Sequence, residues 1–387
     1  MDRAVTTVRT PQSSEAIQRQ LDALDWNFHA ADTRTGVHAI HAYPAKFIPQ
    51  IPGQAIDLFH PGDGSAVLDP FCGSGTTLVE AVVRGVPAVG IDLHPLAILI
   101  SKVKTTLLDE RLTSLAYNVI ENAKQEFAPL PNIPRINHWF DHHVQQELAN
   151  LLRQIDKVRN DGCRDALRVA ASSIIVRVSR QESDTRYAAI EKDVKPGKVY
   201  EEFLRVVQQI DSALETSYGG LFRHEPKVQL MSRDILSVKR QDIPLEIGLV
   251  VTSPPYPNAY EYWLYHKYRM YWLGMDPLAV KAREIGARPH FFKKNPHTAD
   301  DFSQQMDYCF ALFSQLLKRG RYVCLVVGRS VIAGAVVNNA NLISAVAQSN
   351  GFSRVGQVTR DILSSRKTFN PTVGKIKTES LLVFEKQ

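Results

Sequence analysis

The stretch SAVLDPFCGSGTTLVEAVVRGVPAVGIDLHP, residues 65–95, constrains the fold of this chain more than any other. A short apolar run at residues 66–68 predicts a buried strand, and the Gly-Ser-Gly of residues 73–75 predicts a tight turn after it. Residues 76–83 carry apolar side chains at helical spacing, and residues 88–91 predict a second strand. This order of elements is typical of open α/β sheets that bind nucleoside cofactors.

The chemistry of the same stretch suits a ligand that contains a nucleoside. Gly73 and Gly75 let the backbone approach a ligand closely, and the helix that begins at Thr76 offers free N–H groups at its amino end. Asp92 ends the second strand, about 20 residues past the turn, and can accept hydrogen bonds from both ribose hydroxyls. A glycine pair alone is weak support, but turn, helix and acid in this order predict a cofactor site.

Two common cofactor loops do not match this turn. A dinucleotide loop has a third glycine where this chain has Leu78, and a P-loop has Gly-Lys-Ser/Thr, which is absent. Asp69, shortly before the turn, would repel a phosphate but attract a cation such as a sulfonium or an α-amino group. S-adenosylmethionine carries both cations, so it is the ligand that the loop predicts.

A second constrained stretch is VVTSPPYPNAYEYW, residues 250–263. Its apolar run ends in a hydroxyl residue, two prolines and a tyrosine. Proline fixes φ and donates no backbone hydrogen bond, so Pro254 and Pro255 predict a strand that stops at a rigid corner. Taken alone, such a corner indicates a strand terminator with Tyr256 packed behind it.

Taken together, DPFCGSGTT (residues 69–77) and TSPPY (residues 252–256) resemble the methyl-donor and catalytic motifs of S-adenosylmethionine-dependent DNA amino-methyltransferases. The Ser-Pro-Pro-Tyr form resembles the cytosine-N4 branch, whereas adenine-N6 enzymes usually have Asp-Pro-Pro-Tyr. HAIHAYPAKFIPQIP, residues 38–52, is similar to the segment that closes over the methionine end of the cofactor. The tail, residues 364–386, is also similar to the end of such enzymes.

The resemblance implies an α/β fold: a Rossmann-like mixed seven-stranded sheet with helices on both faces and a helical insertion. It implies S-adenosylmethionine as the cofactor and no metal. The acid Asp234, ahead of the catalytic strand, is expected near the adenine. The full set of expected cofactor-binding residues is Lys46, Phe47, Asp69, Pro70, Phe71, Gly73, Ser74, Gly75, Thr76, Asp92 and Asp234.

The resemblance also gives the rigid corner a catalytic role. The exocyclic amine of cytosine is a poor nucleophile, because its lone pair is delocalised into the ring. Acceptors aimed at its hydrogens would localise that lone pair, and we expect them to be the Ser253 hydroxyl and the Pro254 carbonyl. Pro255 makes the corner rigid, and Tyr256 offers a face on which an extruded base stacks, worth roughly 1–3 kcal/mol. The expected reaction is a direct displacement without a covalent enzyme intermediate.

The chain is expected to divide into three parts: residues 1–106 with the cofactor-binding half, a helical insertion at residues 107–220, and the catalytic half at residues 221–387. Helical spacing of apolar residues supports the insertion. Further strands are expected at residues 247–251 and 322–328, a helix at residues 345–352, and a closing antiparallel pair from SRVGQVTRDI and SLLVFEK.

DNA contacts are expected in the insertion and after the corner. RVSRQESDTRYAAI, residues 177–190, has two equally favoured interpretations: contact with phosphates or bases, or a solvated helix end whose acids offset its arginines. The loop at residues 276–298 has five basic and two acidic residues, a net charge of +3, which favours phosphate contact. The aromatic stripe at residues 260–274 is expected to be mostly core, with His266 and Arg269 considered for DNA contact. The expected DNA-binding residues are Arg180, Arg186, Lys267, Arg283, Arg288, Lys293 and Lys294.

Composition is consistent with these expectations. A net charge of +6 and a pI near 9.0 permit a polyanionic partner, and 44% hydrophobic with 22% charged residues describe an ordinary globular protein. The sequence has no apolar run long enough to span a membrane and no signal-peptide core at its start, so a cytoplasmic protein without membrane association is expected, nucleoid-associated in a prokaryote. The four cysteines are scattered, none follows a proline, and they are expected to be reduced and structural.

The favoured function is a cytosine-N4 methyltransferase that acts on a flipped-out base in double-stranded DNA, with a cognate restriction endonuclease as its functional partner. Two alternatives stay open. The same corner can orient the N6 amine of adenine, and the fold can also carry a nucleic-acid-binding or RNA-modifying protein. The recognition sequence and the number of subunits are not determined by these motifs.

Overall fold

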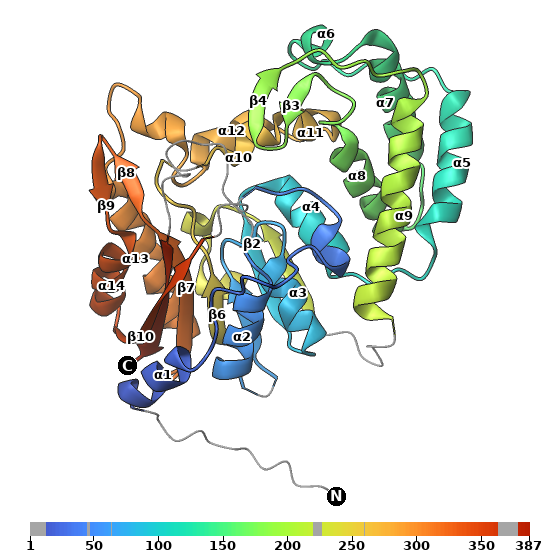
Figure 1. The fold of residues 1–387 in the computed structure, drawn as a ribbon. Helices are drawn as coiled ribbons and strands as arrows, with labels where there is room; N and C mark the ends of the chain where they lie inside the picture. Colours follow the sequence, from blue (N-terminus) through green and yellow to red (C-terminus); the bar gives the residue numbers. More distant parts are fainter. Residues whose placement is uncertain (1–12, 45–46, 63, 220–226, 259, 363–377) are drawn as a thin grey trace, which may run out of the picture.

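The computed structural model describes residues 13–44, 47–62, 64–219, 227–258, 260–362 and 378–387. Its centre is a seven-stranded sheet with the order β10-β11-β7-β6-β1-β2-β5 (Figure 1). The strands are β1 (Ala66–Asp69), β2 (Ala88–Asp92), β5 (Val228–Ser232), β6 (Ile247–Thr252), β7 (Tyr322–Gly328), β10 (Phe352–Asp361) and β11 (Thr378–Lys386). The first five are parallel, while β11 runs antiparallel to both β7 and β10. The expected mixed seven-stranded sheet and its closing antiparallel pair are confirmed.

Helices cover both faces of the sheet. They include α1 (Ser14–Asp22), α2 (Gln50–Phe59), α3 (Thr76–Val83), α4 (Pro95–Lys104), α13 (Ala299–Leu316) and α14 (Asn339–Ser349). Alternate residues of β7 belong to different hydrophobic clusters: Val323 and Leu325 pack with α13 and α14, whereas Cys324 and Val326 pack with α1 and α2. This alternation follows from the period of two in a strand, and it explains why the central strands are apolar throughout.

Local sequence accounts for the bounds of two of these helices. α3 follows Gly75, whose φ of +80° lies in the left-handed region, and it ends before Gly85, whose φ is +69°. α14 begins six residues earlier than expected, because the side chain of Asn338 accepts a hydrogen bond from the N–H of Asn341 and caps the helix.

The insertion is helical, as expected, and lies at the upper right of Figure 1. Its elements are α5 (Leu112–Lys124), α6 (Ile136–Trp139), α7 (His142–Ile155), α8 (Asp161–Ile174), the hairpin of β3 (Gln181–Ser183) and β4 (Arg186–Ala189), and α9 (Lys198–Tyr218). Its buried side chains form one hydrophobic cluster with residues of α4 and of α11 (Lys267–Trp272). The insertion therefore packs on the sheet domain through a shared core.

The remaining elements lie beside the carboxyl ends of the parallel strands or in connections. They are α10 (Tyr262–Tyr265), α12 (Pro277–Arg283), the hairpin of β8 (Ser330–Ile332) and β9 (Ala335–Val337), and the short 3-10 turns η1 (Gly36–Ala39), η2 (Ile235–Ser237), η3 (Arg240–Asp242) and η4 (Arg288–Phe291). Within the described residues, no helix has both the length and the apolar character needed to cross a membrane.

Candidate active site

The glycine turn after β1 is held between β2 and α4. The N–H of Gly73 donates to Oδ2 of Asp92 over 2.8 Å, and the hydroxyl of Ser101 donates to the Gly73 carbonyl over 2.9 Å. Gly75 has no room for a side chain, since a Cβ there would lie 2.7 Å from the Ser101 hydroxyl oxygen. The donor loop is therefore held in place by contacts within the protein.

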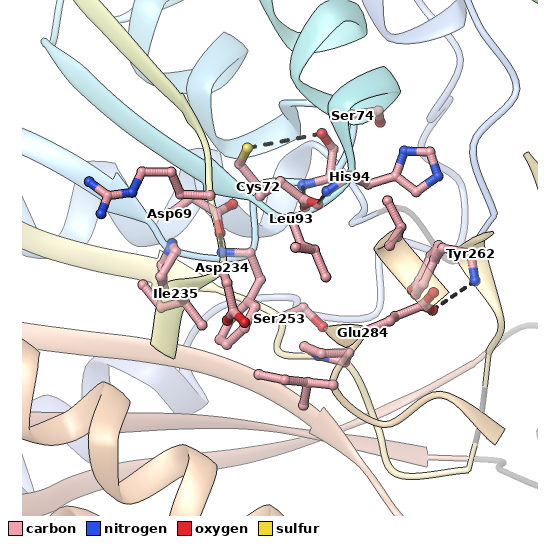
Figure 2. A pocket seen from close by; sticks show the side chains of 18 of the residues that line it. Asp69, Cys72, Ser74, Leu93, His94, Asp234, Ile235, Ser253, Tyr262 and Glu284 are labelled. Atoms are coloured by element: carbon pink, nitrogen blue, oxygen red, sulfur yellow. Dashed lines mark hydrogen bonds between the residues drawn. The ribbon is translucent and has the colours of Figure 1, made fainter. Parts of the chain in front are cut away.

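A pocket opens where β1, β2 and β6 end, and it encloses about 900 Å³ including its mouth to the solvent (Figure 2). It brings Ser253 of the rigid corner together with Gly73 and Asp92 of the donor loop. Most of the residues predicted for the site line this one pocket. They are Phe47, Asp69, Pro70, Phe71, Gly73, Ser74, Thr76, Asp92, Asp234, Ser253 and Pro255.

Four predicted site residues do not appear in this lining. Lys46 lies outside the described residues. Gly75 packs against α4, as described above. Pro254 is buried, and Tyr256 is half-buried. Their expected roles in binding and catalysis stay predictions.

Two carboxyl groups line the pocket, the buried Asp69 and the partly buried Asp92. Burial raises the pKa of Asp69 to about 6, against the opposing effect of hydrogen bonds from Thr252 and from the N–H of Phe71. Burial likewise raises the pKa of Asp92 to about 6, although the N–H groups of His94 and Gly73 donate to its two oxygens. Both groups are mostly ionised at neutral pH and present negative charge to the pocket.

Asp234 reaches the pocket from the segment after β5. Its Oδ1 accepts a hydrogen bond from the N–H of Leu236 over 3.0 Å, which fixes the side chain at the start of η2. Its neighbours Arg233 and Ile235 also line the pocket. This arrangement leaves one carboxylate oxygen without a backbone partner in the described structure, and that oxygen is suited to accept from a ligand N–H.

The hydroxyl of Ser253 is oriented by the neighbouring strand. It donates to the carbonyl of Val326 in β7 over 3.1 Å. A hydroxyl has one proton and two lone pairs, so the bond to Val326 leaves the oxygen of Ser253 as an acceptor toward the pocket. The sequence analysis predicts this role of hydrogen-bond acceptor for Ser253.

Tyr256 is fixed by contacts from two strands. Its ring packs on Gly328 so closely that a Cβ there would lie 2.9 Å from Cε2 of the ring. Its hydroxyl donates to Oε1 of Glu379 over 3.2 Å, and Glu379 forms a 2.7 Å ion pair with Arg360. Burial, reinforced by Glu379, raises the pKa of Tyr256 well above its usual value, so the hydroxyl keeps its proton.

Aromatic residues that sequence reasoning did not assign form one wall of the pocket. Tyr43 stacks on Tyr262, with ring centroids 5.7 Å apart, and on His266 at 4.8 Å. His94 also lines the pocket, and burial lowers its pKa to about 3, so its ring is neutral. The motif HAYPAKF already contains Tyr43, but nothing in the sequence indicates that it meets Tyr262.

Glu284 is a further pocket residue that was not predicted. Its carboxylate accepts hydrogen bonds from the N–H groups of Tyr262 and Trp263 over 2.8 and 3.1 Å and so caps α10 (Figure 2). Burial raises the pKa of Glu284 to about 8, because the two backbone donors only partly compensate for lost solvation. In the sequence this residue lies in a basic segment, where it is one of two acids offsetting five bases.

The predicted DNA-binding residues occupy different environments. Arg283 lines the pocket itself, Lys293 and Lys294 are exposed, and Arg288 lies over the ring of Phe292 at 5.3 Å. Lys267 lies about 6 Å from the ring centroid of Trp263. DNA contact by these side chains stays a prediction.

The arginine-rich stretch of the insertion forms the hairpin β3–β4 rather than a helix end. Arg180 pairs with Asp141 at 2.6 Å, and Arg186 pairs with Glu182 at 2.8 Å. Of the internal ion pairs that one interpretation expected, Arg186–Glu182 is present, whereas Arg180 pairs with a residue outside the stretch. Both arginines keep about half of their side chains exposed.

Two residues that the sequence analysis considers for DNA contact are buried, so that expectation is wrong for them. His266 is 0% exposed and Arg269 is 1% exposed. Arg269 forms an ion pair with Asp184 and donates from Nε to the carbonyl of Ser172 over 3.1 Å. Both side chains belong to the core between α8 and α11, because the aromatic stripe turns this face of α11 inward.

In the part of the chain that the structure describes, the cysteines and the side chains of metal-binding types form neither a disulfide nor a metal cluster. All four cysteines are unpaired and buried, and Cys72 lines the pocket as a small packing residue. Within the described part of the chain, no group of three or more His, Cys, Asp or Glu side chains is arranged to hold a metal ion.

The sheet order and the pocket at its carboxyl edge define a Rossmann-like methyltransferase fold. No family model matches the chain. The chain is similar to type II methyltransferases: it is 27% identical to M.MvaI of Kocuria varians over 252 residues, 60% of this chain and 56% of that protein. It is 23% identical to M.BsoBI of Geobacillus stearothermophilus over 356 residues, 84% of this chain and 67% of that protein.

Two further likenesses are narrower or weaker. M.MjaII of Methanocaldococcus jannaschii, also named a type II methyltransferase, is 38% identical over 93 residues, 23% of this chain and 17% of that protein. The chain thus spans about half of M.MvaI and a smaller part of M.MjaII. The solved structure of the rRNA methyltransferase aviRa from Streptomyces viridochromogenes matches 92% of this chain and 93% of its own with 11% identity, at a TM-score of 0.35 that is too low to support a conclusion.

Proposed function

We propose that this protein transfers a methyl group from S-adenosylmethionine to the N4 amine of a flipped-out cytosine in double-stranded DNA. The observation that carries the proposal is the shared pocket, in which Ser253 of the corner faces the same space as Gly73 and Asp92 of the donor loop. The likeness to type II methyltransferases supports DNA as the substrate. The Ser-Pro-Pro-Tyr corner supports cytosine.

The residues of the pocket fit S-adenosylmethionine. When bound, this cofactor supplies an electrophilic methyl group on a cationic sulfonium. Asp69 and Asp92 give the lining the negative charge that such a ligand needs. The side-chain oxygen of Ser74 is buried in the lining and has no hydrogen-bond partner among the described residues, as expected for a group that a ligand satisfies.

The corner prepares the amine for transfer. Ser253 accepts one hydrogen of the target amine, because its own proton is engaged by Val326, and the Pro254 carbonyl accepts the other. The lone pair of the amine is then localised on nitrogen. Bound S-adenosylmethionine would supply the methyl group to this nitrogen and leave as S-adenosylhomocysteine, and the methylated amine would release its proton to water. The stacked rings of Tyr43 and Tyr262 form an apolar part of the pocket wall beside the transfer site.

The biological setting follows from this reaction. Methylation of a defined DNA sequence protects it from an endonuclease with the same recognition sequence, so we propose a restriction-modification system with such a nuclease as functional partner. Action on genomic DNA implies a cytoplasmic, nucleoid-associated protein.

The test is methyl transfer followed by analysis of the product. Purified protein, methyl-labelled S-adenosylmethionine and genomic DNA are incubated, and the nucleosides are separated by mass spectrometry. We expect N4-methylcytosine from the unaltered protein and none from Ser253→Ala. N6-methyladenine alone would reject cytosine as the target, and label in RNA but not in DNA would reject DNA.

A further inference from the structure

The hairpin formed by β8 and β9 is exposed, apolar and uncharged. Its turn residues Ala333 and Gly334 both have positive φ, +49° and +83°, as in the tight type I′ turns that match strand twist. Val336 is 66% exposed. No charged residue occurs between Arg329 and Arg354 in the sequence. The tip therefore offers a small apolar surface without charge, suited to contact with apolar groups rather than with phosphates.

The hairpin is fixed to the catalytic corner. Asn258, two residues after Tyr256, donates from Nδ2 to the carbonyl of Val331 over 2.9 Å. Asn339 donates from Nδ2 to the carbonyl of Gly328 over 2.8 Å and to the hydroxyl of Ser330 over 2.7 Å. These bonds bracket the hairpin at its base, so its tip is held at a set position relative to the corner.

The hairpin also lies on the side of the sheet where the pocket opens. It follows β7, which runs parallel to β6, so both strands end at the same edge. Figure 1 shows β8 and β9 on the same side of the sheet as α10 and α12, which border the pocket. The exposed Arg329 directly precedes the hairpin. The hairpin therefore projects from the carboxyl edge of the sheet next to the segment of the catalytic corner, with a basic residue at its base.

We propose that the tip of this hairpin, with Val336 at its most exposed point, inserts into the base stack of DNA at the step from which the target base is extruded. The proposal rests on the proposed function. Extrusion of a base unstacks its neighbours and leaves a gap of apolar surface, and an apolar side chain on a rigid support can fill that gap. In a DNA duplex, only the faces of the bases form an extended apolar surface. They are therefore the part of DNA that suits an apolar tip without charge.

The experiment compares substrates that differ only in the cost of extrusion. Once sequencing of DNA from expressing cells has identified the methylated sequence, two duplex oligonucleotides are made, one with a paired target cytosine and one with a mismatch at that position. Val336→Ser is compared with the unaltered protein. We expect kcat/KM to fall about tenfold on the paired duplex and by less than about threefold on the mismatched one, because a mismatched base is cheaper to extrude.

Two variants control the comparison. Val336→Leu keeps an apolar tip and should retain activity on both duplexes. Phe127→Ser removes another exposed apolar side chain, three residues after α5 in the insertion, and should change neither rate. Fluorescence of 2-aminopurine beside the target should fall in Val336→Ser complexes relative to the unaltered protein, since fewer bases are held out of the stack.

Other outcomes overturn the proposal. An equal loss on both duplexes, or no loss on the paired duplex, would show that the tip does not act at extrusion. A dimer in sedimentation that Val336→Ser dissociates would assign the tip to contact between two copies of the chain. If the unaltered protein methylates neither duplex while it binds S-adenosylmethionine, the proposed function itself fails, and the hairpin proposal fails with it.

Discussion

The hydroxyl of Thr252 donates a 2.6 Å hydrogen bond to Oδ1 of Asp69, and both side chains are buried. Thr252 directly precedes Ser253 at the end of β6, while Asp69 ends β1 and opens the donor loop. The bond therefore joins the two motifs that the sequence places 183 positions apart. Donor loop and catalytic corner form one rigid unit at this point.

Replacement of Thr252 by valine removes this bond and keeps the side-chain shape. We expect the free energy of unfolding to fall by about 1–3 kcal/mol, since a buried carboxylate loses a donor. Affinity for S-adenosylmethionine should fall as well, because Asp69 becomes harder to ionise. Urea unfolding and isothermal titration calorimetry measure the two effects. Thr252→Ser keeps the hydroxyl and serves as the control; equal behaviour of both variants would contradict the role of the bond.

Binding of the methyl donor should depend on pH near 6. Asp69 and Asp92 have pKa values raised to about 6, so both lose negative charge as the pH falls through that value. A cationic ligand is held by the ionised forms, so its affinity should decrease from pH 7.5 to pH 5.5. Titration calorimetry across this range measures the effect.

The matched control for this pH dependence is S-adenosylhomocysteine, which lacks the sulfonium charge. Its affinity should change less over the same range. Asp69→Asn protein should bind the cationic ligand more weakly and with a flatter pH profile. A midpoint near pH 4 in the unaltered protein would contradict the assignment to buried carboxyl groups.

Gly328→Ala tests the position of Tyr256. The added Cβ would lie 2.9 Å from Cε2 of the tyrosine ring, so the ring must move. A displacement of about 1 Å in a positioned group costs up to about 100-fold in rate, and we expect kcat to fall by 10- to 100-fold. Affinity for S-adenosylmethionine should stay unchanged, because Gly328 and Tyr256 are absent from the pocket lining. Unchanged kcat would show that Tyr256 needs no fixed position.

Glu379 links the hydroxyl of Tyr256 to the buried guanidinium of Arg360. Glu379→Ala leaves Arg360 without its carboxylate, and we expect the free energy of unfolding to fall by about 3 kcal/mol. Glu379→Gln keeps an acceptor for Tyr256 and should preserve more activity than alanine does. Urea unfolding and methyl-transfer rates separate the two effects. Equal activity of the two variants, after correction for the folded fraction, would exclude a role of Glu379 in positioning Tyr256.

Local pattern was enough to predict much of the sheet. The bounds of α3, β1, β2, β6 and β7 were expected to within one residue, since each is a continuous buried run or a helical stripe ended by glycine, proline or acid. The start of α14 was not predicted correctly, because its capping residue, Asn338, precedes the apolar residues whose helical spacing marks the helix in the sequence. Arg269 and His266 were misjudged, because polar residues in an aromatic stripe look exposed until a partner such as Asp184 is known.

The sequence by itself determined the donor loop, the rigid corner and the sheet that carries them, because glycine, proline and apolar periodicity restrict the backbone locally. Only the tertiary structure decided which remote side chains complete the site: Tyr43 against Tyr262, Glu284 on the start of α10, and Val326 as the partner that orients Ser253. These contacts join segments whose separation along the chain carries no local signal. The contact between Ser253 and Val326 arises from the parallel packing of β6 and β7, which brings distant strand ends to one edge of the sheet.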